Sequence, residues 1–216
     1  MKVIVSSAYW PNVEYLAYLL HAEEVTVEGH EHFQKQSYRT RCSILSANGV
    51  LNLSLPVLHT QSKMKMQEVE LSYKENWQIK HWRAITSAYK NSPYFDFFEE
   101  EVSAFYTKSY KHLLDFNLAQ IQLIGKLLRH SIPVTISQTY VKSPESVLDL
   151  RERLHPKKEP DAAVMRYYSS HPYYQTFGEK FAFVPNLSCL DLLFNTGLES
   201  KAYVRELYHQ ALMRQL

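Results

Sequence analysis

Glycine is scarce in this sequence, which has five glycines among 216 residues. The five are scattered, so they form neither a phosphate-binding P-loop nor the Gly-x-Gly-x-x-Gly fingerprint of dinucleotide-binding proteins. The two nucleotide-binding motifs that are simplest to recognise in a sequence are therefore excluded.

Cysteine is rarer still. Cys42 and Cys189 lie far apart and lack the close spacing of zinc ligands. We therefore expect two reduced thiols rather than a disulfide framework, as is usual in a reducing compartment. His30-Glu31-His32 offers two histidines at alternate strand positions without a third ligand, so no metal site is predicted.

Long apolar runs and a strong net charge are also missing. The apolar part of residues 1–11 is too short for a signal peptide, and no later stretch is long enough to span a bilayer. We therefore expect a cytoplasmic protein without a transmembrane segment. The formal net charge of +2 is too small for general nucleic-acid binding. Any site for an anion must be local.

The chain is 45% hydrophobic and 21% charged, so its 216 residues can bury a substantial core. Short alternating or β-branched stretches predict strands at 2–6, 24–28, 42–46, 51–55, 68–71 and 134–136. Asn48-Gly49 predicts a two-residue hairpin turn. Apolar residues at helical spacing predict helices at 13–20, 73–89, 98–105, 114–128 and 143–154, with a last helix opened by a Thr196/Glu199 capping box. We predict the α/β class, a single domain over residues 1–216 with a mixed sheet from the N-terminal half packed against several helices.

The segment Gln34–Arg41 combines three cations with an aromatic side chain in a strand-like pattern. In an extended chain every second side chain points to the same side, so four of its residues are expected to share one face: Lys35, Ser37, Arg39 and Arg41. Guanidinium groups bind phosphate or carboxylate through paired hydrogen bonds, and the segment therefore predicts an anion-binding surface. The alternative is a solvated edge strand that its positive charges protect from aggregation.

A second candidate is His81, which lies on the apolar side of the helix predicted over residues 73–89. Its ordinary pKa of about 6.5 suits a general base, and Tyr89 on the same helix is placed to line an adjoining cleft. The alternative is a histidine that belongs to the core. The sequence fixes no carboxylate beside it, so no catalytic triad is predicted.

Polar residues interrupt the apolar segment 183–194. Asn186 or Ser188 is predicted to cap a helix there, and Asp191 to complement the positive end of the helix dipole. In the functional alternative, the same helix end and the nearby Gln175 bind an anionic or hydroxyl-rich ligand.

Several motifs along the sequence match one family pattern: Tyr9-Trp10-Pro11, Gln34–Arg41, Lys80-His81, Tyr89, Pro93-Tyr94-Phe95, Tyr174-Gln175, Phe177, Pro185–Ser188, Asp191 and Leu193–Asn195. Together they resemble the WbqC-like family, whose members are often associated with O-antigen and other surface-polysaccharide biosynthesis. The chain departs from that pattern at Gln36 and Thr40, and Glu14 stands where a glycine is expected. These departures leave open whether catalysis is retained.

The resemblance implies a cytosolic transferase-like enzyme of surface-polysaccharide or related metabolite biosynthesis, which transfers an acyl or aminoacyl group to an amino sugar. In this hypothesis an anionic small-molecule or carrier-linked substrate is bound through its phosphate or carboxylate by Lys35, Ser37, Arg39 and Arg41. His81 transfers the proton, and the pocket is shaped by Tyr89, Gln175, Asn186 and Asp191. The alternative is a non-catalytic scaffold protein that docks an acidic ligand or partner on its basic edge. The sequence identifies no particular cofactor.

Overall fold

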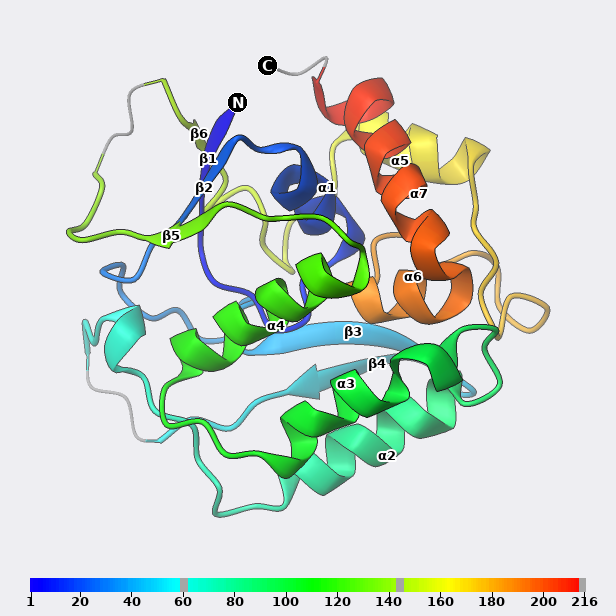
Figure 1. Ribbon diagram of the computed structural model, residues 1–216, viewed down its shortest axis with the longest axis horizontal. Coiled ribbons are helices and arrows are strands. Elements are labelled where there is room, and N and C mark those ends of the chain that lie inside the picture. Colours follow the sequence, from blue (N-terminus) through cyan, green and yellow to red (C-terminus); the bar gives the residue numbers. More distant parts are fainter. Residues whose placement is uncertain (59–61, 143–145, 214–216) are drawn as a thin grey trace.

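A four-stranded parallel sheet lies in the part of the chain that the computed structural model describes, residues 1–58, 62–142 and 146–213 (Figure 1). Its strands are β1 (Lys2–Val5), β2 (Glu24–Val27), β5 (Val134–Ile136) and β6 (Leu148–Asp149). They follow the order β5-β2-β1-β6. The chain therefore moves from β1 to one side of the sheet and later returns to place β6 on the other side.

Helix α1 (Val13–His21) connects β1 to β2, and Asn12 caps its first turn, which confirms the predicted start. The side chains from Val13 to Leu20 are all buried. The reason is that α6 (Cys189–Thr196) and α7 (Ser200–Leu207) both contact this helix, as Figure 1 shows to the right of α1.

Strands β3 (Arg41–Ser46) and β4 (Gly49–Ser54) form an antiparallel hairpin, which confirms the prediction for this segment. The two turn residues are Ala47 and Asn48, one position earlier than predicted, because Ser46 pairs with Gly49. Gly49 has a φ of +101°, a backbone conformation that glycine adopts without strain.

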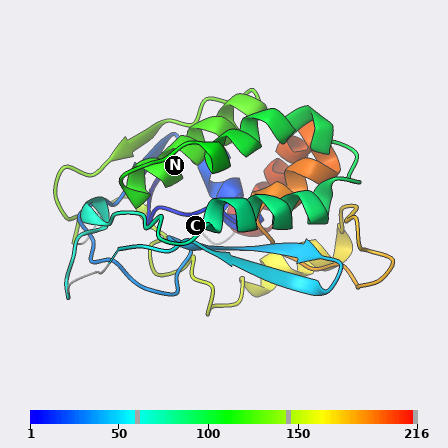
Figure 2. The same cartoon turned by 90° about the horizontal axis from the view of Figure 1, so that it is seen from below.

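Three helices form a layer over the hairpin in Figure 2: α2 (Trp77–Tyr89), α3 (Phe95–Thr107) and α4 (Leu113–Leu127). They confirm the three helices predicted in this part of the chain. Aromatic rings from all three pack edge to face, with Trp77 and Phe105 both against Phe116.

The α/β class is confirmed. The strands form two sheets, the parallel sheet and the β3–β4 hairpin, because β5 and β6 from beyond residue 133 join β2 and β1. Buried side chains from Val3 to Leu212 form a contiguous core. The single-domain organisation is compatible with this core and stays a prediction.

Two local predictions before residue 155 are wrong. Residues 68–71 form no strand, because Met66–Glu68 is a 3-10 turn and isolated bridges alone involve Glu70 and Leu71. In place of the helix expected over 143–154, Leu148–Asp149 pairs with β1 as strand β6, so tertiary pairing overrides the local helical spacing. Residues 143–145 lie outside the described residues.

The C-terminal part contains α5 (Ala162–Ser170), α6 and α7. Ser188 caps α6, as one of the two predicted candidates. The capping box is wrong: Thr196 belongs to α6 and its hydroxyl donates to the Leu192 carbonyl, so it is not placed to cap α7.

Candidate functional site

The cationic segment does not form the expected strand. Residues 35–40 form turns, and Gln36 takes a positive φ of 58°, which bends the backbone. Ser37 is buried, and its hydroxyl donates to the Gln34 carbonyl oxygen at 2.7 Å. The prediction that Lys35, Ser37, Arg39 and Arg41 share one strand face is therefore wrong.

Arg39 is held in a buried ion pair. Its Nη2 donates to Glu31 Oε2 at 2.6 Å, its Nε donates to Glu31 Oε1 at 2.8 Å, and its side chain is 2% exposed. Nη2 also donates to the Ser6 hydroxyl. The guanidinium group is thus occupied by the protein itself. Lys35 is exposed on the turn, and Arg41 is half-buried at the start of β3.

His81 lies in a buried chain of polar groups. Its Nδ1 is 2.9 Å from the Tyr9 hydroxyl, which in turn is 2.9 Å from the Tyr106 hydroxyl. Trp10 Nε1 donates to the same Tyr106 oxygen. Burial lowers the pKa of His81 to about 4, so the ring is neutral near pH 7. This position matches the core alternative.

Three of the predicted pocket residues meet at one buried carboxylate. Asp191 accepts hydrogen bonds from Tyr89 Oη at 2.9 Å, Tyr173 Oη at 2.7 Å and Gln175 Nε2 at 2.9 Å. Burial raises the pKa of Asp191 to about 6, and the three donors oppose that rise. Because Asp191 is 1% exposed, this cluster ties α2 to α6 and to the segment before it rather than facing an open pocket.

A cavity of about 430 Å³ opens at the carboxyl ends of β1 and β6, and we call it the switch-point cavity. It is lined by Asn12, Glu14, Tyr38, Asp149, Glu152, Arg153, Leu154, His155, Lys158, Glu159, Asp161 and Asn186. Because β2 lies on one side of β1 and β6 on the other, the chain order reverses here. In open parallel sheets, such a reversal at the carboxyl ends of the strands is the usual place for a ligand.

Glu14 is the buried carboxyl group of this cavity. It lies in the first turn of α1 and is 4% exposed. Burial raises its pKa to about 7, although Arg153 and the Asn186 side chain both lower it. A carboxyl group with this pKa is present in both protonation states near neutral pH, so it can accept and return a proton.

The start of α1 has no free N–H groups for a phosphate. The Val13 N–H donates to the Leu187 carbonyl at 3.0 Å, and the Glu14 N–H donates to Asn186 Oδ1 at 3.0 Å. The Tyr15 N–H donates to the Asn12 side chain. The anion binding that helix N-termini often provide is therefore blocked here, in agreement with the missing glycine motifs.

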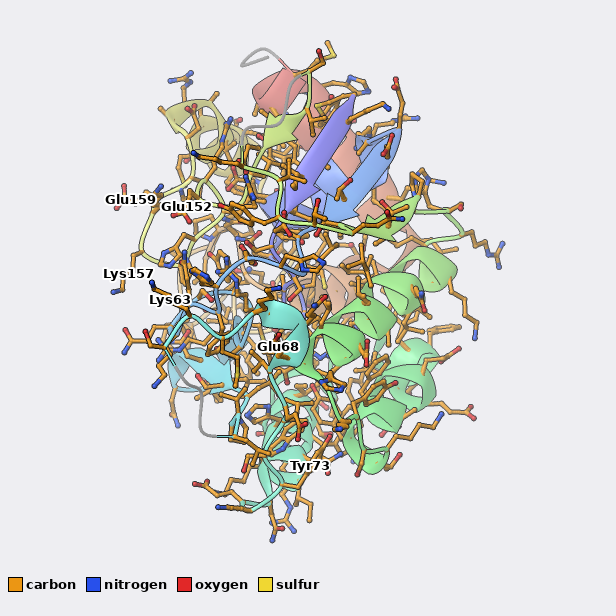
Figure 3. The ribbon with its side chains drawn as sticks, turned by 90° about the vertical axis from the view of Figure 1, so that its left-hand side faces the viewer. Lys63, Glu68, Tyr73, Glu152, Lys157 and Glu159 are labelled. Carbon is orange, nitrogen blue, oxygen red and sulfur yellow. The ribbon has the colours of Figure 1, made fainter. Side chains whose placement is uncertain are left out.

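The cavity wall contributed by the segment after β6 carries both signs of charge. Its carboxylates include Glu152 and Glu159, and its cations include Arg153 and Lys158. Figure 3 labels Glu152 and Glu159, which lie at the left-hand edge of that view. Tyr38, which belongs to the cationic segment Gln34–Arg41, lines the same cavity. Carboxylates, amides and a tyrosine together suit a ligand with hydroxyl and amine groups.

Sequence reasoning found Asn186 but missed Glu14 and the segment after β6. Glu14 lies in the first turn of the helix predicted over 13–20, where a carboxylate normally complements the helix dipole in solvent, so the pattern gave no sign of burial. The one signal was its place where the family pattern has a glycine. The wall at 150–161 includes the end of the helix that the sequence predicts over 143–154, and its actual position depends on the pairing of β6 with β1.

Three further observations concern the state of the cysteines, metal binding and membrane-spanning helices. Cys42 and Cys189 are both buried and free. Among the described residues, no three His, Cys, Asp or Glu side chains are placed to share a metal ion. No helix in the described part of the chain is long and apolar enough to cross a bilayer.

The sequence is similar to known proteins along most of its length. The model of the WbqC-like protein family matches residues 6–159 and 139–203. The uncharacterized protein Rv1507c of Mycobacterium tuberculosis is 22% identical, over 94% of this chain and 96% of its own length. No solved structure shows significant similarity. Since the family matches cover most of the sequence, from the loop after β1 to α7, the chain belongs to the WbqC-like protein family.

Proposed function

We propose that this protein is a cytoplasmic transferase-like enzyme of surface-polysaccharide or related metabolite biosynthesis, which binds an amino-sugar acceptor in the switch-point cavity. One observation carries the proposal: a buried carboxyl group, Glu14, lines a cavity at the switch point and has a pKa of about 7. Asn12 and Tyr38 line the same cavity and supply hydrogen-bonding groups for sugar hydroxyls, and Asn186 lines it beside Glu14.

The proposed reaction transfers an acyl or aminoacyl group from an activated donor, such as a thioester or acyl phosphate. The amine nitrogen forms a bond to the carbonyl carbon of the donor, and the bond from that carbon to the leaving group breaks. The leaving group takes the electron pair, and the nitrogen gives its proton to the Glu14 carboxylate. Glu14 thus acts as the general base, because amines attack carbonyl groups only when unprotonated.

The proposed anion contact differs from the one expected from the sequence. Arg39 is paired with Glu31 inside the protein, whereas Arg153 and Lys158 line the cavity. A phosphate or carboxylate on the acceptor is therefore proposed to meet these two residues. Contacts of Lys35 and Arg41 with a carrier-linked part of the substrate remain a prediction.

Glu14 also takes the proton-transfer role first considered for His81. His81 is not among the residues that line the cavity. Its pKa of about 4 makes it a weak base near neutral pH. We therefore assign it to the support of the aromatic core between the β1 loop and α2.

A thermal-shift screen with matched ligands tests the proposal. Nucleotide-linked amino sugars are compared with the corresponding hydroxyl sugars, and with acyl-coenzyme A species and simple phosphates. A ligand present at about 100-fold its Kd adds about 2.7 kcal/mol, which raises the Tm by several degrees. We expect the amino sugars to raise the Tm more than their hydroxyl counterparts, and Glu14→Gln to abolish that difference. Equal shifts for both sugars, or no shift for any compound, would overturn the acceptor assignment and favour the scaffold alternative.

A further inference from the structure

We propose that Asn186 is a positioning residue that orients the Glu14 carboxyl group and controls its ionisation. This inference rests on the proposed function, because it concerns the group that accepts the proton. It adds a role for a residue 172 positions away in the sequence.

Asn186 contacts Glu14 at two points. Its Oδ1 accepts the Glu14 backbone N–H at 3.0 Å, and its Nδ2 lies 3.4 Å from Glu14 Oε2. One amide side chain therefore fixes both the start of the helix turn and the carboxylate that projects from it.

The orientation of the Asn186 amide is determined by its neighbours. The backbone N–H of Glu14 can only donate, so the atom facing it must be the oxygen. The Tyr168 hydroxyl also donates to this oxygen, at 3.2 Å. Burial raises the pKa of Tyr168 well above its ordinary value, so this hydroxyl remains a donor at neutral pH. The NH₂ group is consequently left to face the carboxylate.

The backbone at Asn186 is held in an uncommon conformation. Its φ is +54°, in the left-handed region that asparagine adopts more readily than most residues. The next residues anchor this conformation, because the Leu187 carbonyl accepts the Val13 N–H and the Cys189 N–H donates to the Pro11 carbonyl. The segment is thus clamped to the start of α1, which keeps the amide beside Glu14.

Other groups also face Glu14 and must be held constant in a test. Arg153 lowers the pKa of Glu14, and Asp161 raises it. Tyr18 and Tyr38 lie near enough for the Glu14 charge to raise their own pKa values. Substitutions at Asn186 leave all four of these side chains unchanged.

The experiment is a pH titration of the Glu14 side chain by ¹³C NMR in the ligand-free protein. The Glu14 signal is assigned by its loss in Glu14→Gln. Asn186→Gly removes the amide while keeping a residue that accepts the positive φ, and Asn186→Asp keeps the Oδ1 acceptor but places a negative charge at the carboxylate. Asn48→Asp, in the exposed hairpin turn, is the charge control.

We expect the pKa of Glu14 to rise by about half a pH unit in Asn186→Gly, because the stabilising donor is lost, and by about one unit or more in Asn186→Asp, because a like charge is added as well. The control is expected to leave it unchanged. An unchanged Glu14 pKa in either folded Asn186 variant would overturn the inference, since a merely structural asparagine predicts that result. If Glu14→Gln leaves amino-sugar binding intact, the proposed function fails, whatever the titration shows.

Discussion

Replacement of Glu14 by glutamine should stabilise the protein at alkaline pH, although it removes the proposed general base. The folded-state pKa of Glu14 is about 7, against an ordinary value of 4.5. Below about pH 4.5 the carboxyl group is protonated in both the folded and unfolded states and has no effect. As the pH rises to 7 and above, the unfolded state gains more from ionisation, so folding is destabilised. At about 1.36 kcal/mol per pKa unit, the full penalty is about 3 kcal/mol.

Urea unfolding at about pH 5 and pH 8 measures this effect. We expect Glu14→Gln to exceed the wild type in unfolding free energy by about 2–3 kcal/mol at pH 8 and by much less at pH 5. Glu159→Gln removes an exposed carboxyl group from the same cavity wall and serves as the control, with little expected change. Equal or lower stability of Glu14→Gln at pH 8 would refute the reasoning.

Three further predictions concern the groups around the cavity and the core. Arg39→Ala leaves the Glu31 carboxylate buried without its partner, and urea unfolding should show a loss of about 3–5 kcal/mol; a loss below about 1 kcal/mol contradicts this. In Gly197→Ala a Cβ would lie 2.5 Å from the Tyr94 ring at a φ of +59°, so thermal unfolding should show a cost of about 1–3 kcal/mol, and an unchanged Tm argues against it. His81 has a folded pKa of about 4, below its ordinary 6.5. The free energy of unfolding therefore decreases as the pH falls from 6.5 to 4, because the unfolded state binds a proton that the buried ring does not. His81→Phe should flatten the stability profile in that window, and an unchanged slope speaks against the buried neutral histidine.

The local elements were largely readable from the sequence because their signals are local. Helical spacing of apolar residues predicted α1, and the alternation around Gly49 predicted the hairpin, since helical periodicity and hairpin turns depend on a few neighbouring residues. The strand β6 was missed because Leu148 and Asp149 are extended through pairing with β1, more than 140 residues earlier. No local pattern carries that information.

The candidate site was harder to predict for the same reason. Arg39 carries a charge that suggested a ligand, but its partner is Glu31 within the protein. Asp191 and Tyr89 were predicted to shape a ligand pocket, yet they meet each other in the core. The backbone N–H of Glu14 donates to the side chain of Asn186, which lies 172 positions later in the sequence. A contact between such distant residues can be recognised only when the fold is known.

The most direct test of the central claim is a crystal structure of the protein with the amino-sugar compound that raises its Tm most. We predict that the ligand occupies the switch-point cavity, with its amine nitrogen within hydrogen-bonding distance of a Glu14 carboxylate oxygen. A ligand bound beside Lys35 and Arg41, with Glu14 left out of contact, would contradict the assignment of Glu14 as the group that receives the proton.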